Sequence, residues 1–232
     1  MPATATIAPA DLAEPADLAD IDAYTLADGA RRAGIGAVLH GLKPQSSAAQ
    51  FIGRARTARI DYRPHGQIPL AEYGTGALLE SCAPGDCLLL DGGGIMLTAM
   101  GDLAVHALHR SGAAAAIINA CVRDIEAIEQ IGLPVFARGP AITTMAGRAK
   151  IVGIGDPVTI DGVTINNGDL IAGCRGGIVA IPWQDRTRAL TEARRVLTSD
   201  QQMLAGIEAG ESFSTLWAKH KALPSLPSTQ GN

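Results

Sequence analysis

The sequence predicts an α/β fold with a mixed sheet, and three observations lead to this class. Two apolar runs, over residues 87–90 and 113–118, each end in a polar or glycine-rich turn followed by a helical pattern, and parallel strands need helical crossovers of this kind. Residues 158–165 carry a hairpin pattern, with Asp161-Gly162 between two Val-Thr-Ile runs. Hydrophobic residues make up 47% of the 232 residues and aromatic residues only 3%, so the core must be aliphatic, as in buried α/β strands.

The first half of the chain alternates apolar periodicity with turn signals. The expected elements are a loose leader over residues 1–16, a helix over 18–33, a strand over 55–62, a short helix over 73–81 and a strand over 87–90. In the first helix, the residues expected to be buried are Leu18, Ile21, Leu26 and Ala30. The strand over 87–90 runs into Asp91 and three glycines, which we expect to form a loop.

The second half opens with a helix near residues 101–110. Its expected apolar stripe is Met100, Leu103, Ala107 and Leu108, and its expected solvent face is Asp102, His106, His109 and Arg110. The elements that follow are a strand over 113–118, a helix over 125–131, a strand over 135–137, the hairpin, one or two strands over 170–181, and helices over 185–210 and 212–220. We expect one domain over residues 17–221 and a tail over 222–232.

Composition excludes several classes of protein. The net charge is −4 and no basic run occurs, so we expect no nucleic-acid partner. No apolar stretch reaches membrane-spanning length, and the N-terminal residues lack the pattern of a secretory signal. The four cysteines have neither zinc-site nor disulfide-framework spacing. These features predict a cytoplasmic protein with reduced thiols and no membrane association.

Two polar segments, residues 91–94 and 119–124, follow the two central apolar runs. Ligands of open α/β sheets collect beyond the carboxyl ends of the strands, so we expect both segments to meet at one site. Within it, Asp124 could ligate a divalent metal and Arg123 could grip a substrate carboxylate. The alternative is that Asp124 is an ordinary helix N-cap, which the local sequence favours. One carboxylate could also do both.

The glycines at 92–94 and Gly101 allow close approach of backbone to an anion, although a plain turn explains them equally well. Asp102 lies beside them in the first turn of a helix, where an acidic residue also complements the helix dipole. The spacing matches neither a nucleotide P-loop nor a dinucleotide-binding fingerprint. No nucleophile elbow, HExxH motif or zinc-like cluster occurs either.

Several motifs in one order resemble the RraA-like family, which joins the regulator of ribonuclease activity A to divalent-metal 4-hydroxy-4-methyl-2-oxoglutarate aldolases. Together the motifs cover most of residues 84–212. They are Pro84-Gly85-Asp86, Gly101-Asp102-Leu103, Val122-Arg123-Asp124, Leu133-Pro134-Val135-Phe136-Ala137-Arg138-Gly139 and Ile207-Glu208-Ala209-Gly210-Glu211-Ser212.

The resemblance implies a swivelling-type α/β/β sandwich that assembles as a homotrimer or a dimer of trimers, with sites between subunits. It also implies a 2-oxo acid that chelates Mg²⁺ or Mn²⁺. By carry-over, Asp124 is the metal ligand and Arg123 contacts the oxygens of the bound acid. Asp102 holds a water on the metal, and backbone N–H groups of Gly101, Asp102, Leu103 and Ala104 receive the carboxylate.

The chain differs from the family pattern at three places. Asn119-Ala120 replaces the usual Asp-Gly, residues 172–177 replace an Ala-Asp-x-Asp-Gly-Val motif, and Asp200 only loosely matches an acidic residue of the last long helix. The leading interpretation is a metal-dependent lyase that cleaves a C–C bond of a 2-oxo acid, by retro-aldol cleavage or oxaloacetate decarboxylation. The alternatives are a non-catalytic regulator that binds a ribonuclease or another protein, and a divergent family enzyme for a different acid.

Overall fold

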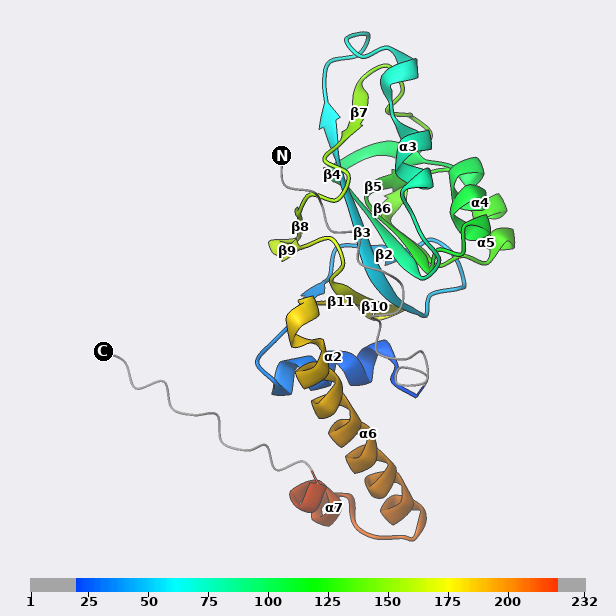
Figure 1. The fold of residues 1–232 in the computed structure, drawn as a ribbon. Helices are drawn as coiled ribbons and strands as arrows, with labels where there is room; N and C mark the ends of the chain where they lie inside the picture. The colour runs from blue at the N-terminus through cyan, green and yellow to red at the C-terminus, as the bar shows by residue number, and fades with distance from the viewer. Residues whose placement is uncertain (1–19, 221–232) are drawn as a thin grey trace.

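The computed structural model describes residues 20–220, which form one mixed sheet, a separate hairpin and a set of helices (Figure 1). The strands are β1 (Ala37–Leu39), β2 (Lys43–Pro44), β3 (Phe51–Tyr62), β4 (Asp86–Met100), β5 (Ala115–Val122), β6 (Val135–Pro140), β7 (Ala149–Val152), β8 (Val158–Ile160), β9 (Val163–Ile165), β10 (Leu170–Cys174) and β11 (Gly177–Ile181). The helices are α2 (Ala23–Arg32), α3 (Thr75–Glu80), α4 (Asp102–Arg110), α5 (Ile125–Ile131), α6 (Arg186–Glu208) and α7 (Phe213–His220), with 3-10 turns η2 (Leu70–Glu72) and η3 (Trp183–Asp185).

The sheet has the order β1-β11-β10-β3-β4-β5-β6-β2, and β7 pairs off this path with the last residues of β3, on the edge opposite β4. β3, β4, β5 and β6 pair in parallel, whereas β1, β2, β7, β10 and β11 pair antiparallel to their neighbours. The helices α4 and α5 are the crossovers from β4 to β5 and from β5 to β6, as the alternation of apolar runs predicts. The predicted α/β class with a mixed sheet and C-terminal helices is therefore confirmed.

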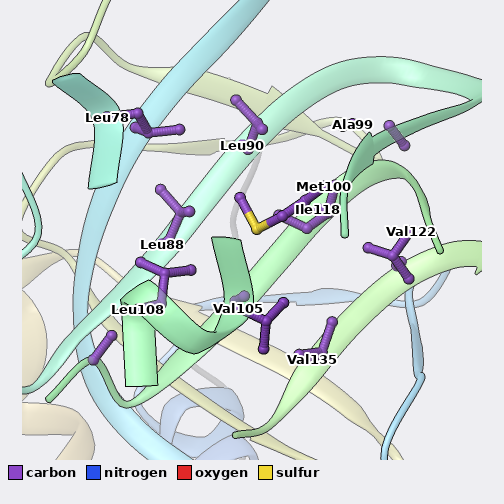
Figure 2. Packing of buried hydrophobic residues seen from close by; sticks show 14 of the residues in the cluster. Leu78, Leu88, Leu90, Ala99, Met100, Val105, Leu108, Ile118, Val122 and Val135 are labelled. Atoms are coloured by element: carbon purple, nitrogen blue, oxygen red, sulfur yellow. The ribbon is translucent and has the colours of Figure 1, made fainter. Parts of the chain in front are cut away.

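The core has two faces because side chains of a strand alternate between the two sides of the sheet. Leu88 and Leu90 of β4 join the cluster that α3, α4 and α5 cover, and Figure 2 shows them beside Val105 and Leu108 of α4. Cys87 and Leu89 point to the opposite face, where the β8–β9 hairpin packs. Every residue of β5 is buried, which explains its continuous apolar pattern.

A third hydrophobic cluster joins α2 to the start of α6 and to one edge of the sheet. Leu26 and Ala30 of α2 pack with Ala189 and Ala193 of α6 and with residues of β10 and β11. The sequence prediction placed Leu26, Ala30 and Ile21 correctly in the interior. Beyond this contact α6 extends away from the sheet, and α7 lies at its far end (Figure 1). No helix within residues 20–220 is long and apolar enough to cross a lipid bilayer.

The hairpin prediction is also confirmed. β8 and β9 pair antiparallel, with Ile160 opposite Val163. Asp161 and Gly162 both have positive φ, 51° and 79°, which is the requirement of a two-residue type I′ turn.

Two predictions were wrong, one of them in part. The stripe predicted for the helix after Met100 is half wrong: Met100 and Leu108 are buried as expected, whereas Leu103 and Ala107 face solvent. Val105 is buried in their place, because α4 contacts the core over one narrow stripe of residues three apart. The glycines at 92–94 do not form a loop outside the sheet, since β4 continues through them with three shifts of register against β5. The predicted leader, Leu18 and the predicted tail lie outside the described residues.

Candidate functional site

Two segments distant in sequence meet where β4 and β5 end. Arg123 donates its backbone N–H to the carbonyl oxygen of Met100 at 3.2 Å. A Cβ atom added to Gly101 would lie 2.6 Å from Oδ2 of Asp124 and 3.2 Å from Nε of Arg123. Gly101 has an extended backbone, with φ of −121°, so its lack of a side chain makes room for this approach rather than serving its conformation. The expected convergence of residues 91–94 with residues 119–124 occurs at Asp91 and Asn119, whereas Arg123 and Asp124 meet Gly101, which lies outside those two segments.

Asp124 precedes the first residue of α5, but its side chain does not cap the helix. The predicted N-cap role of this carboxylate is therefore wrong. The backbone of Asp124 is left-handed, with φ of 61° and ψ of 44°, a region that Asp and Asn tolerate better than most residues. This conformation turns the carboxylate toward Arg123, whose Nε donates to Oδ2 at 3.2 Å.

The Arg123–Asp124 pair is open to solvent, with 51% and 39% of the two side chains exposed. Within the described residues, Oδ1 of Asp124 has no hydrogen-bond partner. An exposed carboxylate with one free oxygen and one arginine neighbour can still accept a ligand without breaking a buried contact.

The start of α4 lies beside this pair. The first helical hydrogen bond runs from the N–H of Val105 to the carbonyl of Gly101 at 3.2 Å, and Gly101 has no side chain with which to cap the helix. The N–H groups of Asp102, Leu103 and Ala104 therefore lack intrahelical acceptors. Asp102 is partly buried, and Leu103 is 80% exposed. The six residues named in the sequence interpretation thus lie in two adjoining segments.

A polar network lies along the neighbouring part of β5. Asn119, which is 4% exposed, donates Nδ2 to Oδ1 of Asp91 at 2.6 Å and accepts Nε of Arg138 at 2.7 Å. Arg138 also donates to Oδ1 of Asp161 at 2.6 Å, and Oδ2 of Asp161 accepts the N–H of Gly41 at 3.0 Å. Sequence reasoning noted Asn119 only as a departure from a family pattern and missed its connection to Arg138 and Asp161.

This network affects the acidity of Asp161. Partial burial disfavours its charged form, but the donors on Arg138 and Gly41 outweigh that effect and lower the pKa of Asp161 below its ordinary value. The charge of His40 acts in the same direction.

The residues that could hold a metal are few. Within the described residues no group of three or more His, Cys, Asp or Glu side chains gathers, which excludes a zinc-like cage there. One exposed carboxylate suits Mg²⁺, which keeps several waters and takes its other ligands from substrate oxygens. Asp124 fits that kind of site because one of its oxygens is free. His106 and His109 are exposed on α4, as expected.

The remaining sequence departures lie on other elements. Arg175 occupies the turn between β10 and β11, where its guanidinium donates to the carbonyl oxygen of Ser47 at 3.1 Å. Asp200 lies within α6.

Comparisons with known proteins agree with the motifs. A protein of Halalkalibacterium halodurans named "Putative 4-hydroxy-4-methyl-2-oxoglutarate aldolase" is 30% identical over 164 residues, which are 69% of this chain and 73% of that protein. Protein DlpA of Legionella pneumophila is 26% identical over 199 residues, 84% of this chain. The match spans only 32% of the length of DlpA.

The fold has a close counterpart among solved structures. The crystal structure of an uncharacterised protein from Pseudomonas syringae pv. tomato superposes with a TM-score of 0.78 at 23% identity, covering 92% of this chain and 99% of that one. The family described as "RraA-like: Aldolase/RraA" matches residues 16–180, a stretch that contains Gly101, Arg123 and Asp124. The chain therefore belongs to the RraA-like family.

Proposed function

We propose that this protein is a carbon–carbon lyase that cleaves a 2-oxo acid and depends on Mg²⁺ or Mn²⁺. The observation that carries the proposal is the contact of Gly101 with the Arg123–Asp124 pair. At this contact lie a guanidinium, a carboxylate with one oxygen that accepts no hydrogen bond, and the N–H groups at the start of α4. A 2-oxo acid that chelates a metal ion would use all three.

Each residue has a distinct role in the proposal. Asp124 would hold the ion, and Arg123 would bind substrate oxygens through its planar fork. The N–H groups of Leu103 and Ala104, at the positive end of α4, would receive the substrate carboxylate. When bound, the ion supplies positive charge where negative charge develops on the keto oxygen.

The proposed cleavage of 4-hydroxy-4-methyl-2-oxoglutarate balances as a retro-aldol reaction. The bond between C3 and C4 breaks, and its electron pair moves onto the half that carries the keto group. The 4-hydroxyl proton leaves as the second carbonyl forms, and a water molecule held by Asp102 would accept it. Reprotonation at C3 gives two molecules of pyruvate. Loss of CO₂ from oxaloacetate would generate the same charge on the same oxygen.

We also propose that copies of the chain assemble as a homotrimer or a dimer of trimers, with this edge between subunits. Two large apolar side chains beside the site support this, since Leu103 is 80% and Ile142 is 94% exposed. Ile142 adjoins the site because the preceding Ala141 donates its N–H to the carbonyl of Val122. Analytical ultracentrifugation of the full chain tests the proposal, and a monomer at micromolar concentration would contradict it.

The test of activity is pyruvate release from a panel of 2-oxo acids, including 4-hydroxy-4-methyl-2-oxoglutarate and oxaloacetate, with Mg²⁺, with Mn²⁺ and with a chelator. We expect release with either ion and none with chelator. Absence of release from every acid would contradict the lyase and favour the alternative of a protein-binding regulator.

Arg123→Lys sharpens this test. Because a point charge cannot replace the fork, kcat/KM should fall by about 10- to 100-fold. The matched control is Arg63→Lys. Arg63 pairs with Asp61 at 2.9 Å with similar exposures, 57% and 39%, but at the end of β3. Arg123→Lys with the activity of the Arg63→Lys control would remove Arg123 from the proposal.

A further inference from the structure

One segment of β4 stands out because most of it lies at the margin of the core, with Ile95 and Leu97 only partly buried against it. From Asp91 to Met100, β4 advances nine residues while β5 advances only three, from Asn119 to Val122. We call residues 92–99 the β4 excursion. Residues 91–97 are partly or fully exposed, whereas the residues before them in β4 are buried. Packing alone therefore fixes this segment weakly.

Hydrogen bonds close the excursion at both ends. At its far end, Thr98 bonds through its backbone to Thr143 and Met145, and the Tyr73 hydroxyl donates to the carbonyl of Ala99 at 2.6 Å. At its near end, Oδ1 of Asp91 accepts both the N–H of Gly93 at 2.9 Å and Nδ2 of Asn119 at 2.6 Å. The chain leaving the far end is Gly101-Asp102, at the candidate site.

The chemistry of residue 119 is determined by its two neighbours. Asp91 needs a donor and Arg138 needs an acceptor, and the asparagine amide offers both without a charge. A flipped amide would place N–H against the guanidinium, so the orientation follows from the partners. A carboxylate at this position would instead lie against Asp91, and two like charges at hydrogen-bond distance in a 4% exposed position repel strongly.

We propose that Asn119 is a positioning residue for the candidate site. Its neutral amide joins Asp91 to Arg138 and thereby holds the near end of the β4 excursion, whose far end continues into Gly101 beside Asp124. The asparagine is an adaptation to Asp91, which requires a donor there. The catalytic consequence rests on the proposed lyase function, whereas the mechanical role does not.

A charge swap tests this inference. Asn119→Asp should lose the donor to Asp91, whereas Asn119→Asp combined with Asp91→Asn should restore it. In the double variant the amide at position 91 donates to the carboxylate at position 119, which still accepts Arg138, and the net charge is that of the wild type. The N–H of Gly93 loses its acceptor there, because Oδ1 of Asp91 accepts both Gly93 and Asn119 in the wild type. The matched control is Asn167→Asp, since Asn167 is exposed and uses its side-chain oxygen only to accept the N–H of Thr57.

The first readout is backbone amide hydrogen exchange at neutral pH. In Asn119→Asp, amides of residues 92–104 should exchange about 10- to 100-fold faster, while those of residues 115–118 stay protected. The double variant should recover the protection of residues 94–104, with faster exchange confined to Gly93, and the control should match the wild type. Wild-type exchange in Asn119→Asp, or no recovery in the double variant, would overturn the proposal. If Asn119→Asp does not fold, the double variant decides: protection of residues 94–104 like that of the wild type supports the proposal, and a misfolded double variant contradicts it.

The second readout is pyruvate release, with kcat and KM measured separately. Asn119→Asp should lower kcat/KM by roughly 10- to 100-fold through misplacement of Gly101 and Asp102, and the double variant should recover it. Faster exchange at residues 92–104 together with wild-type catalysis would refute the positioning role. If the wild type itself releases no pyruvate, the lyase proposal fails, and the exchange pattern still decides whether Asn119 holds the excursion.

Discussion

Asp124 and Asp161 are the two non-glycine residues with positive φ in the described part of the chain, and they use their carboxylates in opposite ways. In the β8–β9 turn, Asp161 accepts from Arg138 and from the N–H of Gly41, so both of its oxygens are occupied. In the turn from β5 to α5, the carboxylate of Asp124 accepts a side-chain hydrogen bond only from its neighbour Arg123 among the described residues. An aspartate with left-handed backbone is thus a structural link in the β8–β9 turn, whereas in the turn from β5 to α5 it has an oxygen available for a ligand.

The difference follows from what surrounds each turn. The partners of Asp161 lie far away in sequence, and they fasten the hairpin to β6 and to the segment after β1. The partner of Asp124 is adjacent in sequence and half-exposed, and no distant donor reaches it within residues 20–220. Left-handed backbone in a non-glycine residue is held by its surroundings, and at Asp124 those surroundings leave one carboxylate oxygen free.

Removing the two carboxylates should give the largest contrast. Asp124→Ala and Asp124→Asn should both lower pyruvate release by at least about 100-fold, as expected for loss of a group that stabilises developing charge. Asp124→Asn should keep the stability of the fold because asparagine tolerates the left-handed region, whereas Asp124→Ala should lose about 1–2 kcal/mol. Kinetics and thermal unfolding measure the two effects. If Asp161→Ala impaired catalysis as much as Asp124→Ala, the proposed difference between a ligand-binding Asp124 and a structural Asp161 would be wrong.

A side chain at position 101, against the carboxylate of Asp124, should have an intermediate effect on catalysis. In Gly101→Ala the new Cβ would displace Oδ2 of Asp124, so kcat/KM should fall by about tenfold. Stability should change little, because extended backbone accepts alanine.

Gly76→Ala is the matched control for that substitution. It lies in α3, where a Cβ would meet no atom within 4 Å, and alanine there should raise helix stability slightly. Full activity in Gly101→Ala would show that the contact with Asp124 is not needed.

The smallest effect concerns stability and pH at Asp161. Because its pKa is lowered in the folded protein, its ionised form stabilises the fold above the unfolded pKa of about 3.9, and this contribution is lost as pH falls through the folded pKa. Asp161→Asn should therefore cost about 1–2 kcal/mol at pH 7 and progressively less below about pH 4. Urea unfolding of both proteins from pH 3 to 7 measures the difference. A cost that does not shrink in acid would contradict this role of the charge.

Local signals in the sequence determined much of the fold. The alternation of apolar runs with helical patterns gave the parallel strands β4, β5 and β6, and Asp161-Gly162 gave the hairpin turn, because each signal depends on residues close together in the chain. The motifs around Gly101 and Asp124 located the candidate site for the same reason. The predicted stripe of α4 was right for Met100 and Leu108 and wrong for Leu103 and Ala107, because the contact with the sheet, rather than periodicity alone, selects which face is buried.

Only the tertiary structure determined which contacts Gly101, Asp124 and Asn119 make. That a side chain at Gly101 would displace the carboxylate of Asp124, 23 residues away in sequence, is visible only in the folded chain. The side chain of Asp124 leaves the N-cap position because its backbone is left-handed and Arg123 lies beside it. The link from Asp91 through Asn119 and Arg138 to Asp161 joins four elements. Hydrogen bonds across such distances depend on the packing of the sheet, which no local pattern records.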